Sequence, residues 1–170
     1  MARRCSTTEP LPCAVYQARV LLRAGVLRRL TSVPFEDFQE RLLRPAERVI
    51  VEEADATGLG FRARHRIIAQ IVVDYQLPNA ADRLEVYEAI LELLDIGYEE
   101  DSQAFRRISR NRDLVNSLGL YDLKTRFYEA CRRVDEQDPI VAQHWAILAI
   151  ENGRLPLAEQ LLGEAQRLAP

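Results

Sequence analysis

Arg64 and His65 form the basic pair in this chain that is best suited to bind an anion, because it lies where a predicted strand runs into a predicted helix. Their side chains donate hydrogen bonds to phosphate oxygens, and the N-terminus of a helix favours negative charge. We therefore identify both as candidate phosphate-binding residues. The alternative is that His65 only caps the helix and that Arg62, Arg64 and Arg66 line a solvated face.

The segment around this pair predicts a β-hairpin followed directly by a helix. The β-branched run Val49–Val51 favours a strand, and Gly58 and Gly60 favour a turn. We expect the hairpin between about Arg48 and Arg64 and the helix over His65–Asp74. Spacings of three and four residues predict a buried helical face made of Ile68, Ile71, Val72 and Tyr75.

Three small helices are predicted before the hairpin, so residues 14–78 resemble a winged-helix module. The first covers Ala14–Ala24 and is stopped by Gly25, and Val26–Leu30 follows as a short apolar piece. Phe35–Arg44 carries Phe35, Phe38, Leu42 and Leu43 inward and is ended by Pro45. This helix would read DNA in such a module, but its acidic residues balance its arginines, so DNA binding is disfavoured.

Residues 79–170 are predicted to be entirely helical. The last two helices, Ile140–Glu151 and Leu155–Leu168, are joined at Gly153 and resemble a tetratricopeptide repeat, a helical hairpin of about 34 residues. Small residues predict their contact, with Ala142, Trp145, Ala146 and Ala149 facing Ala158, Leu162 and Ala165. Leu157, Leu161 and Leu168 would then form an exposed strip open to self-association. The alternative is an ordinary helical hairpin.

Composition excludes several classes of function. With 48% apolar and 29% charged residues and a net charge of -3, the chain is typical of a soluble globular protein with no bulk attraction to nucleic acid or membranes. The 3 cysteines are scattered, so we expect neither a disulfide framework nor a metal site, and a cytoplasmic location. No phosphate-cradling loop and no nucleophile–base pair occurs, so we expect no enzyme.

A winged-helix module whose hairpin runs into a basic, histidine-containing helix start, followed by superhelical repeats, resembles the C-terminal half of a bacterial STAND-type P-loop NTPase. The residues that carry the resemblance are FRARHRIIAQIV, in which Arg64-His65-Arg66 stands where many members have Met-His-Asp. The resemblance implies that His65 contacts the ADP phosphate when an NTPase core is present, that the chain alone holds no cofactor, and that it serves signal transduction, including antiphage defence. Partners would be the NTPase core, a sensed ligand or a second copy. A stand-alone repeat adaptor for proteins and a winged-helix DNA-binding regulator remain as alternatives.

Overall fold

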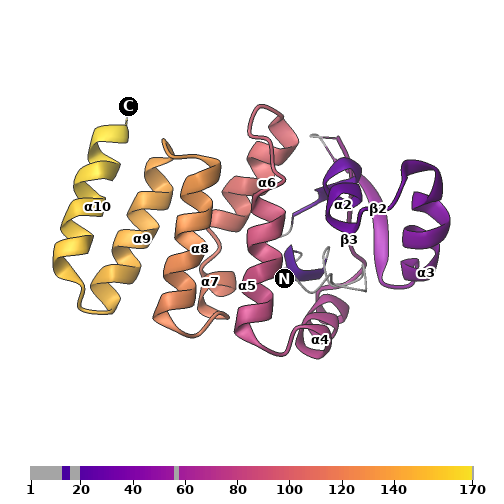
Figure 1. Cartoon of the computed structure of the whole chain (residues 1–170), viewed down its shortest axis with the longest axis horizontal. Helices are drawn as coiled ribbons and strands as arrows, with labels where there is room; N and C mark the ends of the chain where they lie inside the picture. The colour runs from indigo at the N-terminus through magenta and orange to yellow at the C-terminus, as the bar shows by residue number, and fades with distance from the viewer. Residues whose placement is uncertain (1–12, 16–19, 56–57, 170) are drawn as a thin grey trace.

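The computed structural model describes residues 13–15, 20–55 and 58–169, and it has a small antiparallel sheet at one end of a row of helices (Figure 1). This confirms the predicted fold class, mainly α with one β-hairpin. The first part of the chain contains the elements β1 (Leu22–Arg23), α2 (Ala24–Thr31), a 3-10 turn η1 (Phe35–Asp37), a π-helical turn η2 (Gln39–Leu43), α3 (Arg44–Ala46), β2 (Ile50–Asp55), β3 (Gly58–Ala63) and α4 (Arg66–Gln76).

The predicted hairpin is confirmed, with β2 antiparallel to β3 and Glu52 opposite Phe61. Ile50, Phe61 and Ala63 face the core, as alternation along strands requires. Both glycines lie within β3, and residues 56–57 at the expected turn are outside the described part. Gly60 has a packing role, because a Cβ there would stand 2.9 Å from the Cβ of Leu21.

The prediction of a helix over Ala14–Ala24 is wrong at its end, where Leu22–Arg23 forms β1 on the free edge of β3. Residues 16–19 of that predicted helix lie outside the described residues. Gly25 stops no helix but stands in the first turn of α2. Strand β1 is short and pairs with residues far along the chain, so no local pattern marks it.

Helical structure continues past the expected stop at Pro45, through Ala46. Proline lacks an N–H, and its ring crowds the carbonyl four residues earlier. The preceding turn therefore widens to a π-helix, in which the Arg44 N–H donates to the Gln39 carbonyl. Phe38 and Leu42 are buried as predicted, and the ring of Phe38 lies 5.7 Å from that of Phe61.

Helix α4 forms as predicted, but its expected buried face is wrong. Ala69 and Val73 are the residues that α4 buries. Ile71 and Tyr75 are 62% and 81% exposed. The helix packs against β3 through a narrow side of small and medium residues, so most of its large apolar side chains lie away from the core.

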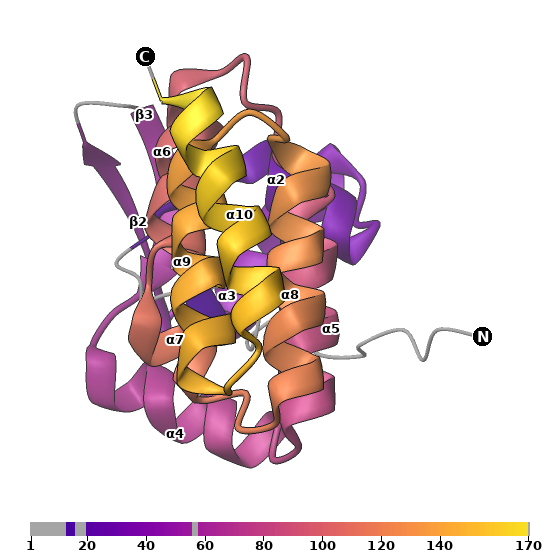
Figure 2. The same ribbon diagram turned by 90° about the vertical axis from the view of Figure 1, so that its left-hand side faces the viewer.

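The second part of the chain is a stack of helices in which α5 packs on α8, α8 on α9 and α9 on α10 (Figures 1 and 2). Aromatic rings run through this stack, from Tyr87 to Phe127 at 6.2 Å, to Tyr128 at 5.5 Å and on to Trp145 at 6.4 Å. The helices are α5 (Ala80–Leu91), α6 (Glu99–Ser109), α7 (Arg112–Asn116), α8 (Tyr121–Val134), α9 (Pro139–Glu151) and α10 (Leu155–Leu168).

The last hairpin confirms the predicted contact face of α9 and part of that of α10, where Ala158 and Ala165 are buried as predicted. In α9 all four predicted contact residues are buried, and Gly153 has the left-handed φ of 68° that the turn requires. In α10, however, Leu161 is buried and Leu162 is 42% exposed, so the predicted exposed strip is wrong. Its exposed side is largely polar and includes Glu159, Gln160 and Arg167.

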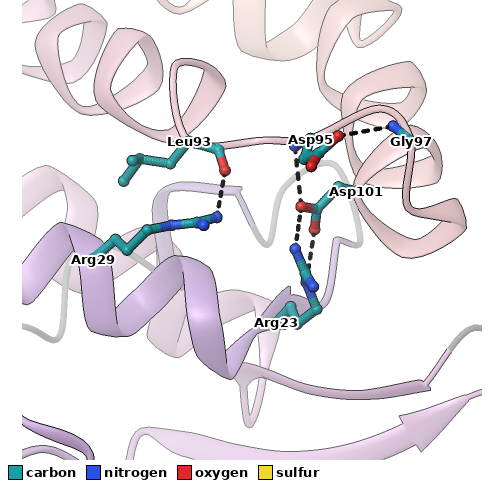
Figure 3. A network of polar contacts seen from close by, with 6 residues as sticks. All are labelled: Arg23, Arg29, Leu93, Asp95, Gly97 and Asp101. Atoms are coloured by element: carbon teal, nitrogen blue, oxygen red, sulfur yellow. Dashed lines mark hydrogen bonds and ion pairs between the residues drawn. The ribbon is translucent and has the colours of Figure 1, made fainter.

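A polar network joins the sheet to the stack (Figure 3). Arg23 at the end of β1 donates from Nε and Nη2 to the two carboxylate oxygens of Asp101, at 3.2 and 2.6 Å. Asp101, in the first turn of α6, is 2% exposed and also accepts the Asp95 N–H at 3.1 Å. Nearby, Arg29 of α2 donates to the Leu93 carbonyl at 2.7 Å. The guanidinium of Arg23 further lies 4.4 Å from the ring centroid of Tyr98.

Among the helices of the described residues, none is long and apolar enough to cross a membrane.

Replacing Asp101 by Asn should destabilise the chain by about 2–4 kcal/mol, because it leaves a half-buried guanidinium without its counter-ion. The control is Glu40→Gln, which removes an exposed ion pair with Arg44 and should cost at most about 0.5 kcal/mol. Urea melts of the variants measure both free energies of unfolding. Equal losses in the two variants would contradict the structural role given to Asp101.

Candidate functional site

The corner between β3 and α4 places His65 at the surface on a fixed backbone. The Arg64 N–H donates to the Val49 carbonyl at 2.7 Å, so the corner is held to the strand side. The Ala69 N–H donates to the His65 carbonyl at 3.0 Å, so the same residue starts the helix. His65 has an extended backbone, an exposed side chain and no side-chain cap bond. Its ring is therefore available to a ligand.

The electrostatics of this corner favour an anion. Arg64, His65 and Arg66 are all exposed, and the first turn of α4 carries no acidic residue. The amides of the first turn add the positive end of the helix macrodipole. A phosphate or carboxylate group in front of the corner would meet positive potential.

The structure does not bring Arg64 and His65 into one cavity. The Arg64 Nη2 donates to the Glu47 carbonyl at 2.9 Å, and the side chain lines an open groove of about 660 Å³ whose lining does not include His65. Glu40, Glu47 and Glu52 also line this groove, so its charge opposes an anion. Arg62, the other expected neighbour of the anion, is paired with Glu53. His65 is thus the residue that remains suited to the predicted contact.

A second candidate site is a pocket of about 150 Å³ between α7 and α9, which is also lined by Tyr128 of α8. Apolar groups and hydrogen-bonding groups meet in it, which suits a peptide segment with one apolar and one polar side chain. Its lining consists of Arg112, Val115, Asn116, Tyr128, His144, Ile147, Leu148 and Glu151.

The charges of this pocket are partly neutralised. Arg112 and Glu151, which both line the pocket, form an ion pair at 2.7 Å. Burial lowers the pKa of His144, and the positive charges of Arg112 and Arg110 lower it further. Burial also raises the pKa of Tyr128, so its hydroxyl stays protonated and can donate. The pocket therefore offers a neutral imidazole and a phenol beside an arginine.

One wall of this pocket could have been predicted from the sequence of α9. The small residues of α9 were used instead to predict its contact with α10. Ile147, Leu148 and Glu151 come three, four and seven residues after His144, so the four share one side of the helix. Arg112 and Asn116, in contrast, come from a separate short helix whose position only the tertiary structure shows. Among the described residues, no cluster of His, Cys, Asp and Glu could hold a metal ion.

Searches of family models, of curated proteins and of solved structures found no match to this chain.

The free energy of unfolding should fall as the pH drops below 6.5, the ordinary pKa of histidine. His144 should cause part of this loss. Its pKa is lowered in the folded chain, so the unfolded chain takes up the proton first and acid favours unfolding. Urea melts at pH 7.5 and 5.5 should show a smaller loss for His144→Gln than for the unsubstituted chain. Gln160→Ala, at an exposed site without a titratable group, is the control and should lose as much as the unsubstituted chain. Equal losses in both variants would contradict the role of His144.

Proposed function

We propose that this chain is the regulatory and sensor part of a STAND-type signal-transduction NTPase, which latches the nucleotide state and binds proteins without catalysis. The observation that carries the proposal concerns His65, which lies between the hairpin and α4. Its side chain is exposed and makes no capping hydrogen bond to the helix. The resemblance of residues 61–72 to this family assigns the histidine at that place to the ADP phosphate. The setting is the cytoplasm.

In this proposal the latch is the contact that His65 and the first turn of α4 make with the nucleotide phosphate. The ring can donate a hydrogen bond to a phosphate oxygen, and Arg66 adds a positive charge beside it. Arg64 is already bound to the Glu47 carbonyl, so its role is to hold the corner rather than to touch the nucleotide. ADP or ATP would be held only with an NTPase core present, because one histidine cannot bind a nucleotide alone.

A path for regulation runs from the latch to the helical stack. The hairpin continues into His65 at one end and pairs with β1 along its edge. Strand β1 ends in Arg23, which is bonded to Asp101 of the stack. A switch needs a ligand with different affinities for two states of the protein. A ligand that binds the stack better when the Arg23–Asp101 bond is changed would have this property, and its binding would alter the position of the latch.

The His65→Ala variant tests the latch. In the isolated chain it should change the free energy of unfolding by about 1 kcal/mol or less, because the side chain is exposed. In the chain assembled with an NTPase core it should release ADP faster and raise basal signalling. Arg167→Ala, exposed on the far helix α10, is the control and should leave both unchanged. Unaltered ADP release, or collapse of the isolated variant, would reject the latch.

A second candidate function is a stand-alone protein-binding adaptor, and the pocket between α7 and α9 favours it. Ile147 is 37% exposed at this pocket and offers an apolar contact. A peptide library selected on the unsubstituted chain should yield binders that Ile147→Asp rejects and that Leu120→Asp, an exposed apolar site outside the pocket lining, retains. Binders insensitive to Ile147 would place recognition elsewhere. In the described residues nothing favours the DNA-binding alternative, since three glutamates line the groove beside η2.

A further inference from the structure

Strand β2 is an edge of the three-stranded sheet. The strand order is β1–β3–β2, so β2 pairs with β3 on one side and with no strand of the described residues on the other. The Arg64 N–H donates to the carbonyl of Val49 at 2.7 Å, one pair beyond Ile50 and Ala63 in the same register. In an antiparallel ladder such hydrogen-bonded pairs alternate with non-hydrogen-bonded ones. This alternation decides which backbone groups of β2 face β3.

The outer edge of β2 presents backbone donors and acceptors that the sheet does not use. Counted from the pair at Val49, every second residue of β2 turns its N–H and C=O groups to β3, beginning with Val51. The groups of Ile50, Glu52 and Ala54 turn outward, and no hydrogen bond in the described part of the chain engages them. Glu52 and Ala54 are exposed. Such a row is a template for one more strand.

A groove beside this edge has room for the side chains of an added strand. It is the open groove of about 660 Å³ between the sheet and the segment η2–α3, and Ile50 and Glu52 line it. Alternate residues of a strand share a face, so Ala54 belongs to the same face as these two. Phe61, opposite Glu52, also lines the groove. A strand added to β2 would therefore place every second side chain over this groove.

The unpaired charge of the groove is acidic. Three glutamates and two arginines line it, so it carries one excess negative charge. Glu40 is paired with Arg44 at 2.8 Å. Within the described ranges Glu47 and Glu52 have no ion-pair partner, and the remaining arginine, Arg64, donates to the Glu47 carbonyl. The groove therefore favours a basic side chain over an acidic one.

We propose that the outer edge of β2 binds an extended segment of another protein as a fourth, antiparallel strand, with a lysine of that segment opposite Glu52. Backbone hydrogen bonds to Ile50, Glu52 and Ala54 hold the segment. The cross-strand charge pair fixes the register and selects the partner. Apolar side chains two residues before and after the lysine lie opposite Ile50 and Ala54. The site involves neither His65 nor the α7–α9 pocket, so it stands whether or not the latch exists.

A second copy of this chain is a poor occupant of the same edge. Two β2 strands can pair about a two-fold axis only where their outward residues face each other. The two such registers that overlap most set either Glu52 or Glu53 directly opposite the same residue of the other copy. Like charges directly opposite one another destabilise a strand pair. The acidic edge therefore disfavours self-pairing and selects a basic strand.

Two capped synthetic peptides test the site. One is Thr-Val-Thr-Lys-Thr-Val-Thr, which places its lysine and two valines on one face, and the other has glutamate in place of the lysine. Titrated into the isotope-labelled full chain, the lysine peptide should shift the amide signals of β2 and slow hydrogen exchange at Glu52 and Ala54. The glutamate peptide should bind at least about fivefold more weakly, because a repulsive cross-strand pair replaces an attractive one. No binding of the lysine peptide at millimolar concentration, equal binding of both peptides, or shifts confined to other elements would overturn the proposal.

Variants of the edge test the register and the backbone pairing. Glu52→Lys should reverse the preference between the two peptides, whereas Glu85→Lys, the same charge change at an exposed site on α5, should keep it. Ala54→Pro removes one outward N–H and should weaken both peptides, because proline is tolerated where the N–H of an edge strand faces solvent. Circular dichroism should show all variants folded. An unchanged preference in Glu52→Lys, the same reversal in Glu85→Lys, or full binding by Ala54→Pro would overturn the proposal.

Discussion

The bond between Arg23 and Asp101 joins two parts of the chain that differ in architecture, and much else depends on it. Asp101 is buried, and a buried carboxylate is tolerated only when opposite charge and hydrogen bonds compensate it. Here two donors come from Arg23 and one from the Asp95 amide (Figure 3). The hydrogen bond to Asp101 in turn raises the pKa of Arg23. The bond therefore aligns the end of β1 with the start of α6.

The position of the candidate latch follows from that alignment. Strand β1 reaches β3 because Gly60 presents no side chain, and Leu22 then pairs with Phe61. Strand β3 leads directly to His65, whose backbone is bonded on both sides of the corner. The corner is thus connected to the helical stack through a three-stranded sheet and one ion pair. The two modules that the sequence separates at residue 79 are coupled in the fold by residues well inside each.

The apolar faces of α4 and α10 show how far helical periodicity reaches. In α10, Ala158 and Ala165 leave space on one side, and the choice between Leu161 and Leu162 as the residue between them depends on a small rotation of the helix. In α4 the apolar residues cover most of the circumference, so several rotations bury a similar set. The helix turns its small residues to the sheet, and the large ones remain outside.

The sequence by itself determined the mainly helical class, the hairpin, the helical nature of residues 79–170 with its last two helices to within one residue, and the exposed histidine at the hairpin–helix junction. These features are local, because strand alternation, β-branched runs, glycine turns and helical spacing act over a few residues. Only the tertiary structure decided the edge strand β1, the Arg23–Asp101 bond, the lining of the α7–α9 pocket and the buried sides of α4 and α10. Each of these depends on residues far apart in the chain, and an apolar pattern states that a helix has a buried side without stating which neighbour covers it.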